Sequence, residues 1–176
     1  ASALAALGTA TAVVEWRGTG ASPVRPGRRA DWGYPELLEH EVLGGLAAMR
    51  SRWPGRPAVM LGHSLGGHIA MMARARATPE LAGVLLVAAG TPHYRTFAPA
   101  VRRKVRLVVL LHKIVTPVVG HYPGQRLGFG GRQPRKLITE WSELAWTGRM
   151  TLHGLDPFKP RTAEVDIRGR LLAVPL

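Results

Sequence analysis

The stretch at residues 58–77, AVMLGHSLGGHIAMMARARA, is the feature that most constrains the fold of this chain. It begins with an apolar run typical of a buried strand, passes through the motif GHSLG at residues 62–66, and continues in a helical pattern. We expect Thr78 and Pro79 to end that helix. Strand, sharp turn and helix in this order form the context in which a G-x-S-x-G motif holds its serine in a strained, exposed conformation. The sequence therefore predicts a reactive serine at position 64.

Glycines surround this serine, at positions 62, 66 and 67. Because the strand and the helix cross closely at such a turn, we expect Gly62 and Gly66 to be required for lack of a side chain, with Gly67 extending the same clearance. The alternative is a glycine-rich turn that carries an inert serine.

Composition fits one folded domain. The 176 residues are 46% hydrophobic and 20% charged, which is ordinary for a globular protein that buries a core. The absence of cysteine excludes a disulfide framework and a thiolate metal site, so the compartment stays open and a cytoplasmic location is only the default. Residues 1–14 are apolar but lack a basic leading segment, so we expect no signal peptide. The chain does not start with Met, and we expect it to begin inside a longer protein.

The net charge of +13 is unevenly spread. Residues 1–90 hold 9 Arg and 6 acidic residues, whereas residues 91–176 hold 15 Lys or Arg and 5 acidic residues. Such a bias attracts an anionic substrate, an anionic lipid surface or nucleic acid. No nucleic-acid-binding motif accompanies the charge, so we expect no specific nucleic-acid binding.

The first 90 residues read as alternating helices and strands. We expect a helix at residues 2–7 that ends at Gly8, a buried strand at 11–16 and a tight turn at 17–23. An amphipathic helix follows from Pro35 to Arg52.

The serine motif comes next, and an apolar strand at residues 83–89 follows it. Strands and helices of these lengths predict an α/β fold with a parallel sheet that helices flank.

The pattern changes after residue 90. Residues 91–170 show no convincing strand alternation, and we interpret them as a helical cap inserted over the sheet before a returning strand at 171–176. Seven of the eleven aromatic residues gather in this segment: Tyr94, Phe97, Tyr122, Phe129, Trp141, Trp146 and Phe158. The domains expected are thus a core at 1–90, the cap at 91–170 and a truncated core strand at 171–176.

Two stretches of the cap segment leave alternatives open. The apolar run at residues 105–111 is too short to span a membrane, but with its basic neighbours it fits either a cap helix facing the site or a helix on an anionic lipid surface. The glycine-rich loop at 124–131 lacks the lysine of a phosphate-binding loop, so we expect it to let the cap bend.

Four segments together resemble the α/β-hydrolases, in particular bacterial predicted hydrolases of the serine aminopeptidase and monoacylglycerol lipase type. They are EWRGTGAS at residues 15–22, GHSLGG at 62–67, VLLVAAG at 84–90 and LLAVPL at 171–176. The resemblance extends to the stretch at 122–130 and covers essentially the whole chain, as the central part of such an enzyme.

This resemblance implies acyl transfer by a serine nucleophile. Ser64 matches the nucleophile, and the Leu65 backbone N–H matches one donor of the oxyanion hole. The second donor is implied to lie upstream of Ala1. The triad acid and the catalytic histidine are implied to follow Leu176, so neither role is carried onto a residue here.

Substitutes for that histidine are few. His63 adjoins the serine in sequence, but the turn directs it away. His93, near the end of the strand at 83–89, is the best internal candidate, although a polar role at the cap hinge with Tyr94 is the plainer interpretation. We assign His63, His93 and Tyr94 to substrate contacts, and we expect His68 to be packing. No histidine spacing fits zinc, so we expect no metal and no cofactor.

Two functions from different classes follow, beside a third alternative, an interaction protein for anionic surfaces whose binding weakens steeply with salt. The first is a serine hydrolase that acts on the ester or related acyl bond of a small neutral or anionic substrate in a full-length parent, with this chain alone inactive. The second is a non-catalytic binding module that keeps the pocket but lacks a base. The sequence leaves the oligomeric state and the acyl group open.

Overall fold

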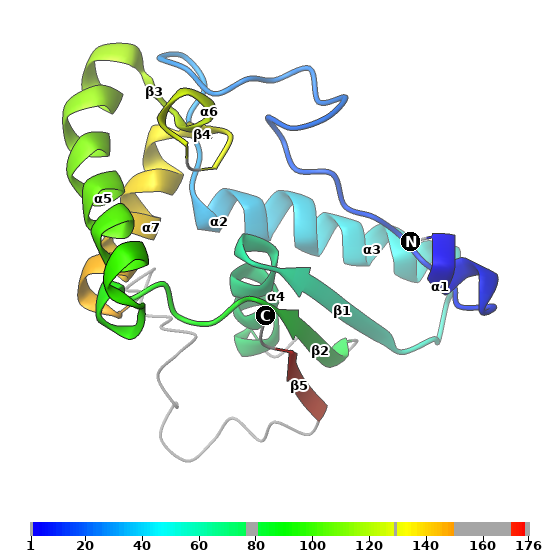
Figure 1. The fold of residues 1–176 in the computed structure, drawn as a ribbon. Coiled ribbons are helices and arrows are strands. Elements are labelled where there is room, and N and C mark those ends of the chain that lie inside the picture. The colour runs from blue at the N-terminus through cyan, green and yellow to red at the C-terminus, as the bar shows by residue number, and fades with distance from the viewer. Residues whose placement is uncertain (1, 77–80, 129, 150–169, 175–176) are drawn as a thin grey trace.

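The computed structural model of this chain describes residues 2–76, 81–128, 130–149 and 170–174 (Figure 1). A small parallel sheet lies beside the helix α4 (Leu65–Ala75), and a separate pair of long helices lies to one side of it. The strands run in the order β1 (Ala58–His63), β2 (Leu81–Val87) and β5 (Arg170–Val174).

All three strands are parallel, with Leu61 opposite Leu85 and Leu86 opposite Ala173. Parallel strands need crossover connections, and here the first crossover is the helix α4 itself. The predicted strands at 58–61 and 83–89, and the parallel α/β arrangement, are confirmed, and the returning strand is present as β5.

A long helical segment packs against α4 and leads into β1. It consists of α2 (Tyr34–Glu36), a π-helical stretch η1 (Leu37–Val42) and α3 (Leu43–Arg52). Pro35 lies in its first turn, as predicted. The side chains of Leu38, Val42 and Leu46 are buried. The helix expected between Pro35 and Arg52 is therefore confirmed, although its middle is π-helical.

The main hydrophobic core lies between this helix, α4 and the sheet. Its large side chains that are at most 1% exposed are Tyr34, Leu37, Ile69, Leu81 and Leu144. Leu144 lies in α7 (Arg135–Thr147), a helix that follows β2 in the chain, so this helix contributes to the same core. Burial of each such side chain contributes about 1.5–3 kcal/mol before the entropic cost of ordering it.

The strand predicted at residues 11–16 is wrong. The helix α1 (Ser2–Ala6) and the left-handed Gly8 after it are confirmed, but the following segment pairs with no described strand. Val13 is 75% exposed. A strand is stable only when a neighbour satisfies its backbone groups and covers one face, and β-branched composition alone supplies neither. The turn at 17–23 is confirmed, with Gly18 and Gly20 both at positive φ.

The segment after β2 is mainly helical, as expected, but it also contains a hairpin. The long helices are α5 (Pro99–Val119) and α7 (Arg135–Thr147), and a 3-10 turn η2 (Tyr94–Thr96) precedes them. Between them lie β3 (His121–Pro123), the short helix α6 (Gly124–Leu127) and β4 (Arg132–Pro134).

Strands β3 and β4 pair antiparallel, so the expectation of no strand between residues 91 and 170 is wrong. The glycine-rich loop closes this hairpin: the Gly124 N–H donates to the Gly131 carbonyl, and Gly128 and Gly130 have positive φ.

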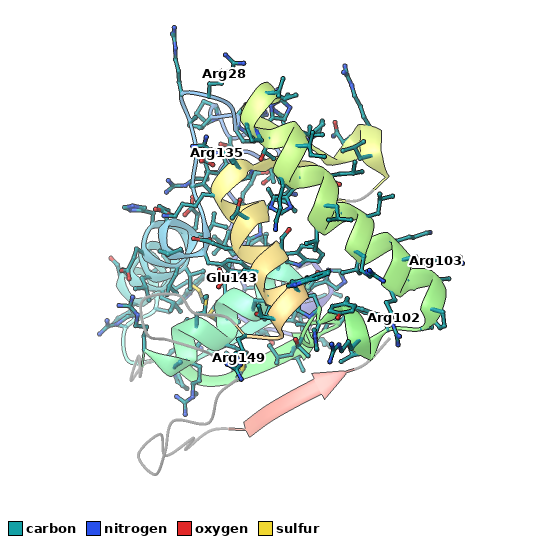
Figure 2. The ribbon with its side chains drawn as sticks, turned by 90° about the vertical axis from the view of Figure 1, so that its left-hand side faces the viewer. Arg28, Arg102, Arg103, Arg135, Glu143 and Arg149 are labelled. Carbon is teal, nitrogen blue, oxygen red and sulfur yellow. The ribbon has the colours of Figure 1, made fainter. Side chains whose placement is uncertain are left out.

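Helices α5 and α7 pack side by side (Figures 1 and 2). Val105 and Val109 meet Ala145, and Trp141 borders all three hydrophobic clusters. A buried hydrogen bond of 3.1 Å joins His112 Nδ1 to Ser142 Oγ across the same interface. Within the described part of the chain, no helix is both long and apolar enough to cross a bilayer.

The aromatic residues of this segment mostly serve packing. Tyr122 is fully buried between Val108 and Ile138, and Tyr94 stacks on Trp146 with ring centroids 5.0 Å apart. Phe129 and Phe158 lie outside the described residues, as do Thr78 and Pro79, which were expected to end α4.

Glu140 connects α7 to the start of α2. Its Oε2 accepts a hydrogen bond of 2.7 Å from the Tyr34 N–H, while Lys136 pairs with Glu36 one turn away. Burial raises the pKa of Glu140 to about 7, and the nearby carboxylates of Glu36 and Asp31 add to the increase. The carboxyl is therefore more basic in the folded protein than in the unfolded chain.

We predict that Glu140 makes stability fall as pH rises. Because its folded pKa exceeds the unfolded value of about 4.5, the proton stabilises the fold at low pH, and this contribution is lost as the pH rises towards 7. Glu140→Gln keeps an acceptor for the Tyr34 N–H and does not ionise. Urea unfolding at about pH 5 and about pH 8 should show a smaller decrease for this variant than for the wild type. The exposed Glu143→Gln on the same helix is the control, and an unchanged decrease in the Glu140 variant would contradict the assignment.

Candidate active site

Ser64 lies at the carboxyl end of β1, at the turn into α4. Its φ of 51° and ψ of −116° form a backbone conformation that non-glycine residues rarely adopt. The Ser64 N–H donates to the Val87 carbonyl at 3.0 Å, and the Ser64 carbonyl accepts from the N–H groups of Gly67 and His68. These bonds hold a conformation that costs on the order of 1–3 kcal/mol, and the serine side chain stays exposed.

Close contact between strand and helix surrounds this turn. A Cβ at Gly62 would lie 2.4 Å from the Gly66 carbonyl oxygen, and a Cβ at Gly67 would lie 2.2 Å from the Ala89 Cβ. At Gly66 the nearest atom is in the Trp16 ring, at an ordinary 3.7 Å. The expectation for Gly62 is confirmed. The second position that excludes a side chain is Gly67 rather than Gly66, because Gly67 faces Leu86 in β2 and Ala89 just after that strand.

Leu65 is the first residue of α4. An N–H in the first turn of a helix has no acceptor within that helix, and the aligned peptide dipoles give this end a partial positive charge. The Ser64 hydroxyl does not cap the helix. Within the described ranges no hydrogen bond engages this hydroxyl, and the adjacent backbone donors at the start of α4 suit an anionic oxygen.

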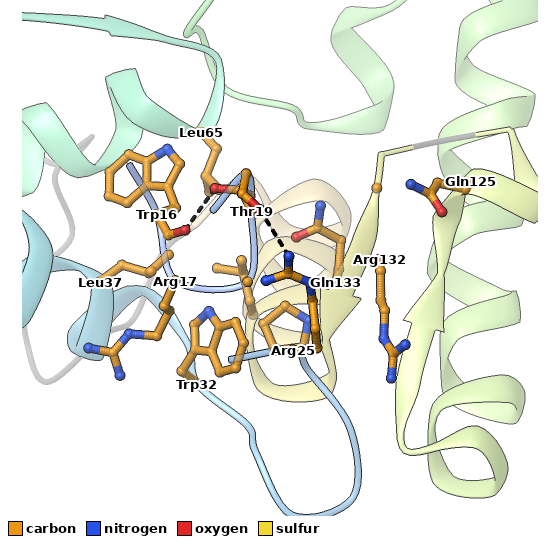
Figure 3. Close-up of a pocket in the computed structure, with 15 residues that line it drawn as sticks. Trp16, Arg17, Thr19, Arg25, Trp32, Leu37, Leu65, Gln125, Arg132 and Gln133 are labelled. Atoms are coloured by element: carbon orange, nitrogen blue, oxygen red, sulfur yellow. Dashed lines mark hydrogen bonds between the residues drawn. The ribbon is translucent and has the colours of Figure 1, made fainter. Parts of the chain in front are cut away.

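A cavity of about 650 Å³ extends from Leu65 to the β3–β4 hairpin (Figure 3). Trp16 and Trp32 form part of its wall, and Arg25 and Arg132 line it together with Arg17. The full lining is Trp16, Arg17, Gly18, Thr19, Gly20, Arg25, Trp32, Leu37, Leu65, Gln125, Gly131, Arg132, Gln133, Pro134 and Leu137.

No acidic side chain belongs to that lining, so the cavity is basic in character. Arg17 is paired with the carboxylate of Glu41. Arg25 and Arg132 donate to backbone carbonyls, which carry no formal charge, so these two side chains keep their net positive charge. None of the aromatic residues after residue 90 that the structure describes contributes to this wall.

The other predicted site residues lie at two places. His63 is exposed at the end of β1. The His93 ring packs against Gly148 after α7 and meets Tyr94 edge-on at 5.2 Å, so both belong to the junction between β2 and the long helices. Between described residues, no hydrogen bond joins Ser64 to a histidine ring.

His68, which we expected only to pack, makes hydrogen bonds to two other segments of the chain. Its Nε2 lies 3.2 Å from the Gly90 carbonyl, which only accepts, so Nε2 carries the proton and Nδ1 accepts from the Tyr34 hydroxyl at 3.0 Å. Burial lowers the pKa of His68, which keeps the ring neutral. This ring therefore connects α2, α4 and the loop after β2. The sequence signal for these contacts was only a histidine on the apolar face of α4. Across the described ranges, no three His, Asp or Glu side chains gather to hold a metal.

A strained serine between a parallel strand and a covering helix is the arrangement of an α/β-hydrolase. A sequence model of the serine aminopeptidase S33 family matches residues 1–141, about four fifths of the chain. The chain belongs to this hydrolase family. No curated protein and no solved structure shows significant similarity to it.

The turn generates a prediction about its glycines. Gly67→Ala should lower the free energy of unfolding by about 1–3 kcal/mol or more, because the added methyl would overlap Ala89. Gly62→Ala should be at least as harmful, since its methyl meets backbone atoms. Gly66→Ala is the matched control and should be neutral or stabilising by up to about 1 kcal/mol, because alanine favours helix. Urea unfolding measures all three, and equal costs at positions 66 and 67 would contradict this geometry.

Proposed function

We propose that this chain supplies the nucleophile of a serine hydrolase that acts on an ester or related acyl bond. The observation that carries the proposal is the backbone of Ser64, whose positive φ leaves its hydroxyl exposed beside the first turn of α4. Membership of a hydrolase family supports the same reaction class.

The proposed reaction begins when Ser64 Oγ attacks the acyl carbonyl carbon. The carbonyl oxygen becomes an oxyanion, which accepts a hydrogen bond from the Leu65 N–H. One such donor is worth about 10²–10³ in rate. A general base must take the serine proton and return it to the leaving group. The family resemblance assigns the base and the acid to positions beyond Leu176, and the second oxyanion donor to a position before Ala1.

The cavity beside Leu65 supports a substrate that carries a negative charge. Arg25 and Arg132 line it and donate to backbone carbonyls, whereas Arg17 is paired with Glu41, and Trp16 and Trp32 offer apolar surface for an acyl chain. In this proposal the helical segment after β2 covers the site, and His63, His93 and Tyr94, which lie outside the cavity lining, contact parts of the substrate that extend beyond the cavity.

A non-catalytic binding module is the second candidate. Among the described residues no hydrogen bond joins a histidine ring to the Ser64 hydroxyl, and a serine without a base is weakly nucleophilic. In that case the cavity would bind a ligand without turnover.

A fluorophosphonate probe separates the two candidates. In a protein that carries this chain together with the proposed base and acid, we expect stoichiometric labelling, its complete loss in Ser64→Ala, and a decrease in esterase kcat of at least about a thousandfold. The isolated chain of 176 residues should not be labelled. An unlabelled long protein that still binds acyl ligands would favour the binding module.

Ser142→Ala is the matched control for this experiment. Ser142 is the serine that the structure does pair with a histidine, yet both side chains are buried between α5 and α7. Labelling should survive in this variant. If it were lost there and kept in Ser64→Ala, the assignment of the nucleophile would be wrong.

A further inference from the structure

We propose that the outward face of α5 docks on an anionic membrane surface. This inference does not depend on the reactivity of Ser64.

The helix α5 has two apolar sides, and only one of them packs against the protein. Val105, Val109 and His112 are buried on the side that faces α7. The opposite side carries Leu107, Leu110, Ile114 and Val118, which are 55%, 55%, 70% and 67% exposed. Their spacing of three and four residues aligns them in one stripe along the helix. We call these four residues the outer stripe.

Basic side chains border the outer stripe. The sequence of α5 contains Arg102, Arg103, Lys104, Arg106 and Lys113 and no acidic residue. All of these except Arg102 are exposed. Arg102 instead donates to the carbonyls of Arg95 and Phe97 at the start of the helix.

Figure 2 shows Arg102 and Arg103 at the same end of α5. The sequence at residues 91–149 holds eleven Lys or Arg and two Glu, a net charge of +9. The field around the stripe is therefore strongly positive.

An exposed apolar stripe within a positive field fits an anionic bilayer better than the other candidate occupants. A second copy of this chain would bring two like-charged helices together, which costs free energy. Nucleic acid would satisfy the charge but would leave the apolar stripe in water. On a bilayer the stripe enters the boundary of headgroups and acyl chains while Arg and Lys extend to the lipid phosphates. Because α5 is not apolar enough to span, it would lie in the plane of the surface.

Vesicle sedimentation tests the proposal on the intact chain. Vesicles of phosphatidylcholine with about one third phosphatidylserine should bind the protein, pure phosphatidylcholine should bind it far less, and added salt should weaken the binding. Leu110→Gln with Ile114→Gln should lower the partition coefficient by at least about tenfold. Arg103→Gln with Lys113→Gln should lower it by roughly 25-fold, about fivefold for each charge.

Matched variants outside α5 control for general loss of apolar surface or charge. Leu7→Gln with Val13→Gln removes two residues that are at least as exposed, and Arg52→Gln with Arg56→Gln removes two charges from the other side of the molecule. Both pairs should bind vesicles within about twofold of the wild type, because neither touches the outer stripe.

Three results would overturn the proposal. They are equal binding to neutral and anionic vesicles, equal losses in the control pairs and the α5 pairs, and a dimer in light scattering that Leu110→Gln with Ile114→Gln converts to a monomer. The last result would show that a second copy covers the outer stripe.

Discussion

The close crossing of β1 and α4 is the constraint on which the rest of this structure depends. Gly62 and Gly67 allow the helix to leave the strand within two residues, and the hydrogen bond from Ser64 to Val87 fixes the turn against β2. The strained backbone of Ser64 exists only because these contacts outweigh its cost. The position of the hydroxyl is therefore fixed by contacts within the fold.

A second set of buried polar contacts orients the elements around this crossing. The neutral His68 ring joins the Tyr34 hydroxyl to the Gly90 carbonyl, so α2, α4 and the loop after β2 keep fixed positions. Glu140 extends this connection to α7 through the Tyr34 N–H. Helix α7 is thus attached to the core through buried polar contacts. Helix α5 packs on α7, and its outer stripe stays exposed.

The elements that local patterns predict well are those that are continuous in sequence. The parallel strands, the helix from Pro35 to Arg52 and the serine turn all follow from periodicity and from Gly and Pro positions. The strand predicted at 11–16 failed because strand formation needs a partner at its edge, which composition does not reveal. The pairing of His121–Pro123 with Arg132–Pro134 was missed because three-residue strands carry no alternation.

In the site, too, the sequence predicts features formed by neighbouring residues but not contacts between segments that are far apart in the chain. The motif predicts that Ser64 occupies the turn, but which of Gly66 and Gly67 excludes a side chain depends on Ala89, which lies 22 residues farther along the chain. Likewise, seven aromatic residues gather after residue 90 in the sequence, yet Tyr122 packs against α5 and α7, while Trp16 and Trp32 line the cavity. Contacts of this kind join segments that no sequence window contains.

An experimental structure of this chain joined to its proposed base and acid, determined after reaction with a phosphonate ester, is the decisive measurement. We expect density continuous from Ser64 Oγ to phosphorus, a Ser64 φ near +50°, and a phosphoryl oxygen within hydrogen-bonding distance of the Leu65 N–H. An adduct on another residue, or an unmodified Ser64 with a negative φ, would contradict this expectation.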